Sequence, residues 1–141
     1  MAVDLPHLLT RADALLSRLE ALLPHPVTAP DWQAAVAWRY RKRGGAGTLE
    51  PVRQLGGIRL ADLKEVDAQK ERLVRNTAQF VAGREANNVL LTGARGTGKS
   101  SLIKACLNEF SPRGLRLIEV DKADMIDLPD LADLVAGRPE R

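Results

Sequence analysis

The chain has 141 residues, of which 45% are hydrophobic and 28% are charged; this length favours one globular domain over two full ones. No apolar run reaches the roughly 18 residues of a membrane-spanning helix, and the N-terminus lacks the basic segment of a secretion signal. We therefore expect a cytoplasmic protein with no membrane span. The formal net charge is only +3, but basic and acidic residues are unevenly distributed along the chain.

The first predicted element is an amphipathic helix over residues 8–23. Its apolar residues recur at helical spacing and are Leu8, Leu9, Ala12, Leu15, Leu16, Leu19, Leu22 and Leu23. We expect the helix to end at Pro24, Pro26 and Pro30. A leucine-rich stripe of this kind usually packs against its own domain, and binding of a separate protein partner through the N-terminal helices is the alternative.

A second helix is predicted from Asp31, which would serve as its N-cap, to about Arg43. One side of this helix would be lined by Trp32, Val36 and Tyr40. The helix would end in a basic cluster made of Arg39, Arg41, Lys42 and Arg43. We interpret this cluster as a solvated helix end, where cations interact favourably with the helix dipole. Contact with nucleic acid or acidic lipid is the less favoured alternative, since arginines interleaved with aromatic residues suit phosphates and bases.

A flexible joint is predicted at Gly44-Gly45-Ala46-Gly47, because glycine-rich segments are poor at forming helices or strands. We therefore divide the chain into a helical N-terminal region with its linker, residues 1–47, and a domain proper, residues 48–141.

Helices and short apolar strands alternate beyond the joint. A helix is predicted from about Asp67 to Val81, a buried parallel strand at Asn88–Thr92, and a helix from Gly98 to about Phe110. A second strand over residues 115–120 and a short helix over residues 129–135 would follow. The only cysteine, Cys106, falls on the inward face of its helix, which favours a core thiol over a nucleophile. This alternation predicts an α/β fold built on a parallel sheet with flanking helices.

A phosphate-binding pattern, Gly-x4-Gly-Lys-Ser, lies between the predicted strand at residues 88–92 and the helix that follows. Glycines let successive backbone N–H groups point into a concavity sized for phosphate, and the helix adds the positive end of its dipole. Lys99 would reach the β- and γ-phosphates, Ser100 would ligate Mg²⁺, and Ser101 would lie towards the α-phosphate. Arg95 is interpreted as a solvent-facing residue of the loop. The predicted nucleotide-binding residues are Gly93, Ala94, Arg95, Gly96, Thr97, Gly98, Lys99, Ser100 and Ser101.

Nucleotide hydrolysis requires more than this loop: a second acidic site on Mg²⁺, a group that orients water, and usually an arginine. Asp121 follows a predicted strand, but Glu119 interrupts the apolar run before it and no second acid follows directly. We interpret Asp121 as a cap of the turn after that strand. The other acidic residues of this part are interpreted as solvated helix positions: Asp124, Asp127, Asp130 and Asp133.

The residues around the loop carry a family resemblance. Asn87–Lys104, Leu115–Lys122 and Asp127-Leu128-Pro129 resemble a little-characterised bacterial family of AAA+ ATP-binding proteins, catalogued as a domain of unknown function. Leu60–Phe80 looks like the nucleotide-flanking helix of that family, and coverage runs from about Leu49 to the end. The resemblance implies a P-loop NTPase fold of AAA+ type preceded by a small helical appendage, ATP and Mg²⁺ as cofactors, and an ATPase that forms a homo-oligomer in its full-length form.

In that family the next strand carries the Walker B acids, and a sensor strand, an arginine finger and a helical lid follow it. Residues 138–141 look like the segment just before that strand. The resemblance therefore implies that residues 48–141 are the N-terminal half of the ATP-binding domain, incomplete at the C-terminus, with the hydrolytic residues beyond this chain. A parallel sheet without its central strands leaves open edges, so we expect marginal stability or self-association.

The sequence thus predicts ATP binding through a Walker A loop, and two alternatives stay open. A small-molecule P-loop kinase shares the Gly-Thr-Gly-Lys-Ser loop, but such kinases usually begin at the strand before it. A non-catalytic nucleotide-dependent interaction module would use the leading helices and the basic cluster to dock a partner.

Overall fold

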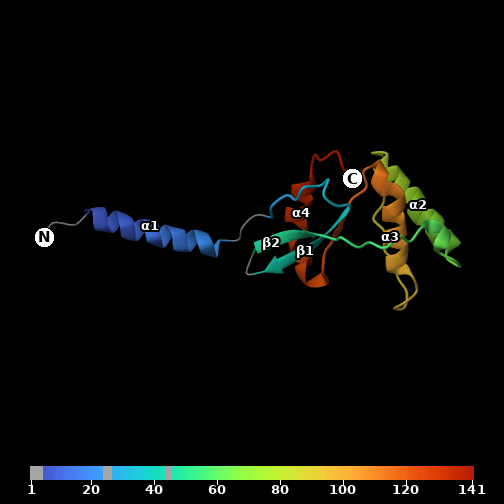
Figure 1. The fold of residues 1–141 in the computed structure, drawn as a ribbon, viewed down its shortest axis with the longest axis horizontal. Helices are drawn as coiled ribbons and strands as arrows, with labels where there is room; N and C mark the ends of the chain where they lie inside the picture. The colour runs from blue at the N-terminus through green and yellow to red at the C-terminus, as the bar shows by residue number, and fades with distance from the viewer. Residues whose placement is uncertain (1–4, 24–26, 44–45) are drawn as a thin grey trace.

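The computed structural model describes residues 5–23, 27–43 and 46–141 (Figure 1). Pro24 and Pro26, which were expected to end the first helix, and Gly44 and Gly45 of the expected joint lie outside the described residues. Within those residues the chain is a small α/β structure with four α-helices, α1 (Leu5–Leu22), α2 (Asp67–Val81), α3 (Lys99–Phe110) and α4 (Leu128–Val135), and three strands, β1 (Ala37–Arg43), β2 (Ala46–Pro51) and β3 (Leu117–Glu119). None of these helices is both long and apolar enough to cross a membrane.

The three strands form one mixed sheet in the order β2-β1-β3. β1 and β2 pair antiparallel, with Tyr40 opposite Leu49. β1 and β3 pair parallel, with Arg39 opposite Glu119. The sheet therefore joins chain segments from both sides of the boundary expected at residue 47.

The predicted second helix, from Asp31 to Arg43, is wrong, because most of that segment is strand β1. The Asp31 carboxylate accepts a hydrogen bond from the Gln33 N–H at 3.0 Å, so it stabilises a turn and not a helix start. Within β1, Trp38 and Tyr40 alternate with Arg39 and Arg41, which is the two-residue period of a strand. Aromatic residues also favour strands. The basic cluster therefore lies on a sheet, not at a helix end.

The buried hydrophobic residues lie mainly on β1 and on one face of α3, with Trp32 and with Leu131 of α4 in addition. Trp38 packs edge-on against Trp32, with ring centroids 4.8 Å apart. From α3 the core receives Leu102, Ala105, Cys106, Leu107 and Phe110. The Cys106 thiol is a core group as expected, donating a weak hydrogen bond to the Thr77 hydroxyl of α2 at 3.4 Å. Burial raises the pKa of this thiol, which disfavours the reactive thiolate.

The segment expected to form a buried strand, Asn88–Thr92, joins no strand and is exposed except at the half-buried Leu91, with Leu90 86% and Val89 49% accessible. Asn76 of α2 holds the start of this segment: its side-chain amide donates to the Asn87 carbonyl and its oxygen accepts from the Asn87 N–H, both at 2.8 Å. A cavity of about 370 Å³ lies between the segment, α2, α3 and residues 115–117. A short apolar run in the sequence indicates a possible strand, but it does not indicate whether another strand lies beside it to pair with.

Helix α1 confirms the predicted N-terminal amphipathic helix, but its expected packing against its own domain is wrong. It extends away from the sheet and the other helices (Figure 1), and none of its residues is buried. Its leucine side chains are 48% to 81% accessible.

A buried carboxylate ties β1 to the chain that precedes α4. Asp127 closes the 3-10 turn η3 (Lys122–Asp127) and is only 9% accessible. It accepts hydrogen bonds from the Tyr40 hydroxyl at 2.9 Å and from Lys42 Nζ at 2.8 and 3.1 Å. The Tyr40 ring lies over Gly47, where a Cβ would overlap it. Asp127, expected to be a solvated helix position, is thus a structural residue.

We predict that Leu107→Ala lowers the free energy of unfolding by about 2–5 kcal/mol, because it empties a buried site on α3. Leu90→Ala is the matched control and should change it by no more than about 0.5 kcal/mol, since that side chain is exposed. Urea denaturation followed by tryptophan fluorescence measures both. A loss at Leu90 as large as that at Leu107 would mean that Asn88–Thr92 is a buried strand after all.

We predict that the single tyrosine of the chain titrates near pH 12 in the folded protein. Burial, together with the hydrogen bond to Asp127, raises the pKa of Tyr40 from 10.0 to about 12. Because the folded state holds the phenolic proton more tightly, this stabilisation is complete below about pH 10 and is lost as the pH rises through about 12. Phenolate absorbance should therefore rise about two pH units later in native than in urea-denatured protein. Coincident titrations in the two states would contradict the buried contact.

Candidate functional site

The glycine-rich loop adopts the backbone that its sequence requires. Gly93, Gly96 and Gly98 have φ angles of 140°, 85° and 84°, in the region that side chains with a Cβ disfavour. A Cβ at Gly93 would come within 3.2 Å of the Thr97 hydroxyl. The loop therefore turns sharply at three glycines before the helix begins.

Helix α3 starts directly after this loop, at Lys99, and runs for 12 residues. Its N-cap is Gly98, which supplies no side-chain hydrogen bond, and its first turn holds no acidic residue. The first N–H groups of a helix have no partner within the helix. The start of α3 thus combines uncapped donors with the positive end of the helix dipole, an arrangement that attracts anions.

The Lys99 ammonium lies across the loop. Its Nζ donates to the carbonyl oxygens of Gly93 and Ala94 at 2.7 and 2.6 Å, and to the Thr97 hydroxyl at 3.2 Å. The Thr97 hydroxyl in turn donates to the Ala94 carbonyl at 2.9 Å. A positive charge is therefore held at the loop by neutral acceptors alone.

A cavity of about 300 Å³ adjoins the loop, and not all predicted residues reach it. Gly93, Thr97, Gly98 and Lys99 line it, facing residues that sequence reasoning did not assign to the site: Leu63, Lys64, Val66 and Gln69. Of the remaining predicted residues, Ala94, Arg95, Gly96, Ser100 and Ser101 do not line this cavity. Arg95 is exposed, as expected.

Ser100, the predicted magnesium ligand, faces a different cavity of about 350 Å³ on the sheet side of α3. Glu119, Arg39 and Lys104 line the same cavity. Within the described part of the chain, no group of three or more His, Cys, Asp or Glu side chains is gathered to hold a metal ion.

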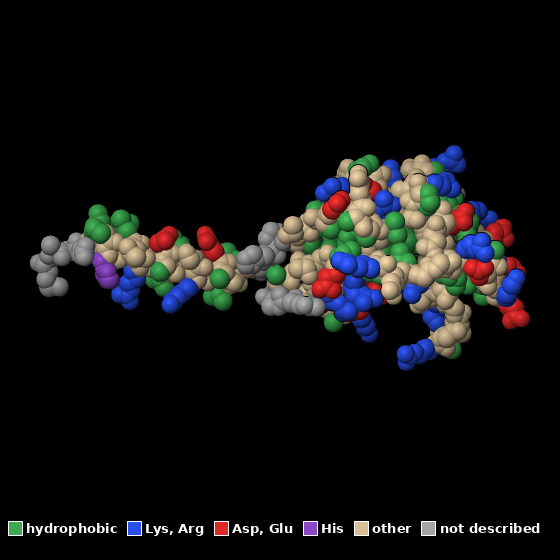
Figure 2. All heavy atoms as spheres, in the orientation of Figure 1, with side chains coloured by type: hydrophobic (Ala, Val, Ile, Leu, Met, Phe, Trp, Pro, Cys, Tyr) green, Lys and Arg blue, Asp and Glu red, His purple; other side chains and the backbone are tan. Residues whose placement is uncertain are grey.

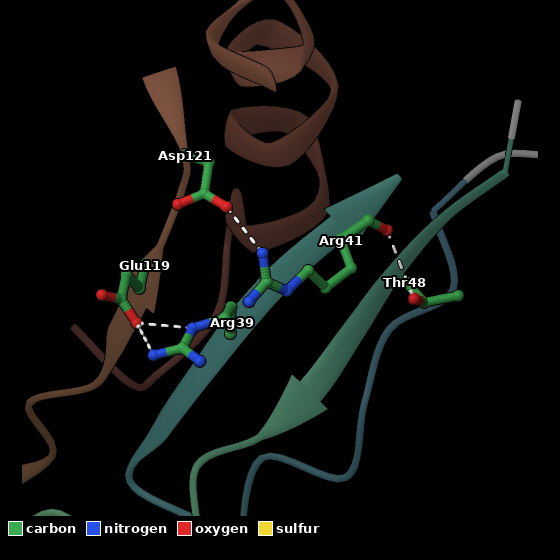
Figure 3. Close-up of polar contacts among 5 residues, drawn as sticks. All are labelled: Arg39, Arg41, Thr48, Glu119 and Asp121. Carbon is green, nitrogen blue, oxygen red and sulfur yellow. Dashed lines mark hydrogen bonds and ion pairs between the residues drawn. The ribbon is translucent and has the colours of Figure 1, made fainter. Parts of the chain in front are cut away.

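The basic cluster and the acidic residues after α3 meet across the sheet (Figure 3). Glu119 Oε2 accepts from Arg39 Nε at 2.8 Å and pairs with Nη2 of the same guanidinium at 2.7 Å. Asp121 pairs with Arg41 at 2.6 Å, and Lys42 with Asp127 at 2.8 Å. The side chain of Arg43 lies outside the described residues. The cations described at this cluster are thus neutralised within the chain.

This pairing corrects the role expected for Asp121, whose carboxylate makes no capping hydrogen bond at the turn that follows it. Asp130 and Asp133 are exposed, as expected for solvated helix positions, and Asp124 is half-buried. A signal for the pairing exists in the sequence. Arg39 and Arg41 are two residues apart, which places both on one face of a strand, and Glu119, at the end of β3, and Asp121, just after it, have the same spacing.

The comparisons with known proteins give a family but no activity. No curated protein and no solved structure matches the chain. The family model described as "Protein of unknown function (DUF815)" matches residues 33–141, a range that includes β1, the glycine-rich loop and α3. Because that model covers more than half of the chain, the protein belongs to the DUF815 family.

Proposed function

We propose that the chain binds the phosphates of Mg-ATP at the loop from Gly93 to Ser100. The observation that carries this proposal is the path of the loop: glycines at positive φ lead directly into the uncapped N-terminus of α3. Such a path favours backbone N–H groups that converge on a phosphate, and these hydrogen bonds add to the charge of a nearby lysine.

Lys99 supplies the side-chain charge. Its three contacts are to neutral oxygens, whereas a hydrogen bond from an ammonium to a phosphate oxygen joins two opposite charges and is roughly twice as strong. A nucleotide at the loop would therefore draw Lys99 away from the Gly93 and Ala94 carbonyls and onto the β- and γ-phosphates. The cavity between the loop and Leu63–Gln69 offers room beside this position.

Magnesium would be held mainly by the nucleotide. Mg²⁺ commonly keeps several waters and binds through phosphate oxygens with one or two protein oxygens. The Ser100 hydroxyl is exposed, but it lines the cavity on the sheet side of α3 and not the loop cavity, so it would have to turn towards the nucleotide to serve as such a ligand. Glu119 lines the same cavity, but its carboxylate is engaged by Arg39. The residues present thus fit a magnesium ion that arrives with ATP better than one bound alone.

The assignment to the AAA+ class and to ATP hydrolysis belongs to the same proposal and rests on the resemblance of residues 87–104 and 115–122. Binding is better supported than turnover. The two acids nearest to a Walker B position, Glu119 and Asp121, are each held by an arginine of β1, so neither is free, as it stands, to ligate Mg²⁺ or to activate water.

Titration of Mg-ATP into wild-type protein and into Lys99→Ala, followed by calorimetry, tests the proposal. We expect the variant to bind at least about tenfold more weakly, because it loses a charge-assisted contact to phosphate. Lys122→Ala is the control: it removes an exposed lysine that lines neither the loop cavity nor the cavity at Ser100, and it should bind as the wild type does. Equal affinity of Lys99→Ala and wild type would refute the proposal.

We also predict that Gly98→Ala weakens Mg-ATP binding and lowers the free energy of unfolding by about 1–2 kcal/mol. Gly98 has φ 84°, and a Cβ there meets no atom within 4 Å, so the cost comes from the left-handed backbone alone. Gly57→Ala is the control, since Gly57 also has open space around it but no positive φ. If both variants bind and unfold like wild type, the loop does not need the backbone described.

A further inference from the structure

Helix α1 presents an apolar face that nothing in the described chain covers. All 18 of its residues are exposed, and the helix extends away from the sheet and the other helices (Figure 1). Helices in proteins gain most of their stability from packing an apolar face and not from intrinsic helix propensity. The apolar face of α1 is therefore expected to pack against a partner outside the described chain.

The apolar residues of α1 repeat every seventh position. The leucines of α1, with Ala12 and with Leu23 directly after the helix, form three columns: Leu5, Ala12 and Leu19; Leu8, Leu15 and Leu22; Leu9, Leu16 and Leu23. Two of these columns are the a and d positions of a heptad and the third is the e position. A strict seven-residue repeat keeps its apolar face towards a partner helix when two helices coil around each other in a left-handed sense.

The two edges of this face carry opposite charge. With about 100° of rotation per residue, Arg11 and Arg18 fall on one edge and Asp13 and Glu20 on the other. Figure 2 shows the same division, with the acidic side chains of α1 along its upper side and the arginines along its lower side.

The placement of the charges on the two edges of α1 favours a second copy of the helix over a membrane surface as the partner. Helices that lie on anionic membranes carry an excess of Lys and Arg on their polar face and often Trp or Phe on the other, whereas α1 has two acids, two arginines and no aromatic residue. When two copies of α1 pair in parallel, the basic edge of each faces the acidic edge of the other. Antiparallel pairing would set basic against basic and acidic against acidic.

We propose that α1 is a parallel self-association helix, which joins two copies of this chain through its leucine columns. In register, Arg11 of one copy lies near Asp13 of the other, and Arg18 near Glu20, on both sides of the pair. The contact is independent of the glycine-rich loop, so nucleotide binding and self-association can each fail without the other.

Cysteine cross-linking tests the parallel register. Leu8→Cys, made in a Cys106→Ala chain, should form a disulfide-linked dimer on mild oxidation, because equivalent d positions face each other in a parallel pair. In an antiparallel pair the two sites would be separated along the axis by about 16 Å, well beyond the roughly 7 Å limit for a disulfide. Ser17→Cys, on the outer face, is the control and should stay largely uncross-linked. Equal cross-linking at both sites, or none at Leu8→Cys, would overturn the proposal.

Reversing the charges on one edge of α1 tests whether the basic edge of one copy pairs with the acidic edge of the other. Sedimentation of the full chain over a range of concentrations should show a monomer–dimer equilibrium. The double variant Arg11→Glu with Arg18→Glu should weaken the dimer by roughly tenfold or more, because four edge contacts become repulsive. Mixing it with the double variant Asp13→Arg and Glu20→Arg should restore dimers.

Three results would count against the proposal. They are a chain that is monomeric at every concentration, a dimer indifferent to the reversal, and a mixture that does not recover. Fluorescence of the buried Trp32 and Trp38 would show that the folded body is intact in each variant, which separates loss of the contact from loss of the fold.

Discussion

Strand β1 is the element that holds β2, β3 and η3 together, and its two faces are stabilised by different forces. One face buries Trp38 and Tyr40, and the other directs arginines towards acids some 80 residues later in the chain. Exposed ion pairs of this kind contribute little each. Removing a partner of the nearly buried Asp127 would cost more, because an unpaired charge would remain inside the protein. Aromatic burial thus contributes more to the stability of β1 than its exposed ion pairs do, and the buried Asp127 joins β1 to η3.

The elements that the sequence predicted well are those whose signal is local. The bounds of α2 match the prediction, and α1, α3 and α4 lie within a few residues of it, because apolar residues at helical spacing persist over several turns. The segment of β1 was misassigned because Trp32, Val36 and Tyr40 are four residues apart and fit a helix as well as a strand. The prediction of a strand at Asn88–Thr92 was wrong for another reason: a short apolar run does not specify which strand it pairs with.

The difference between local signals and long-range contacts also explains what could be predicted of the candidate site. The path of Gly93–Gly98 and the start of α3 follow from neighbouring residues, so the sequence located them. The residues across the cavity, Leu63–Gln69, and the ion pairs between β1 and the acids after α3 depend on segments brought together only by the fold. The basic cluster shows why charge runs mislead when read alone: its net effect depends on carboxylates that lie far away in the sequence and directly beside it in space.

The paired hydrogen bonds between Asn76 and Asn87 have a further consequence. A carboxamide has the same donor and acceptor as a peptide group, and here it makes both bonds that a neighbouring strand would make to residue 87. The Asn76 side chain thus takes the place of a neighbouring strand at residue 87, so a β-ladder cannot extend through that residue. Backbone pairing between the segment before the loop and another strand can therefore begin only at Asn88 or later, unless the two hydrogen bonds between Asn76 and Asn87 break.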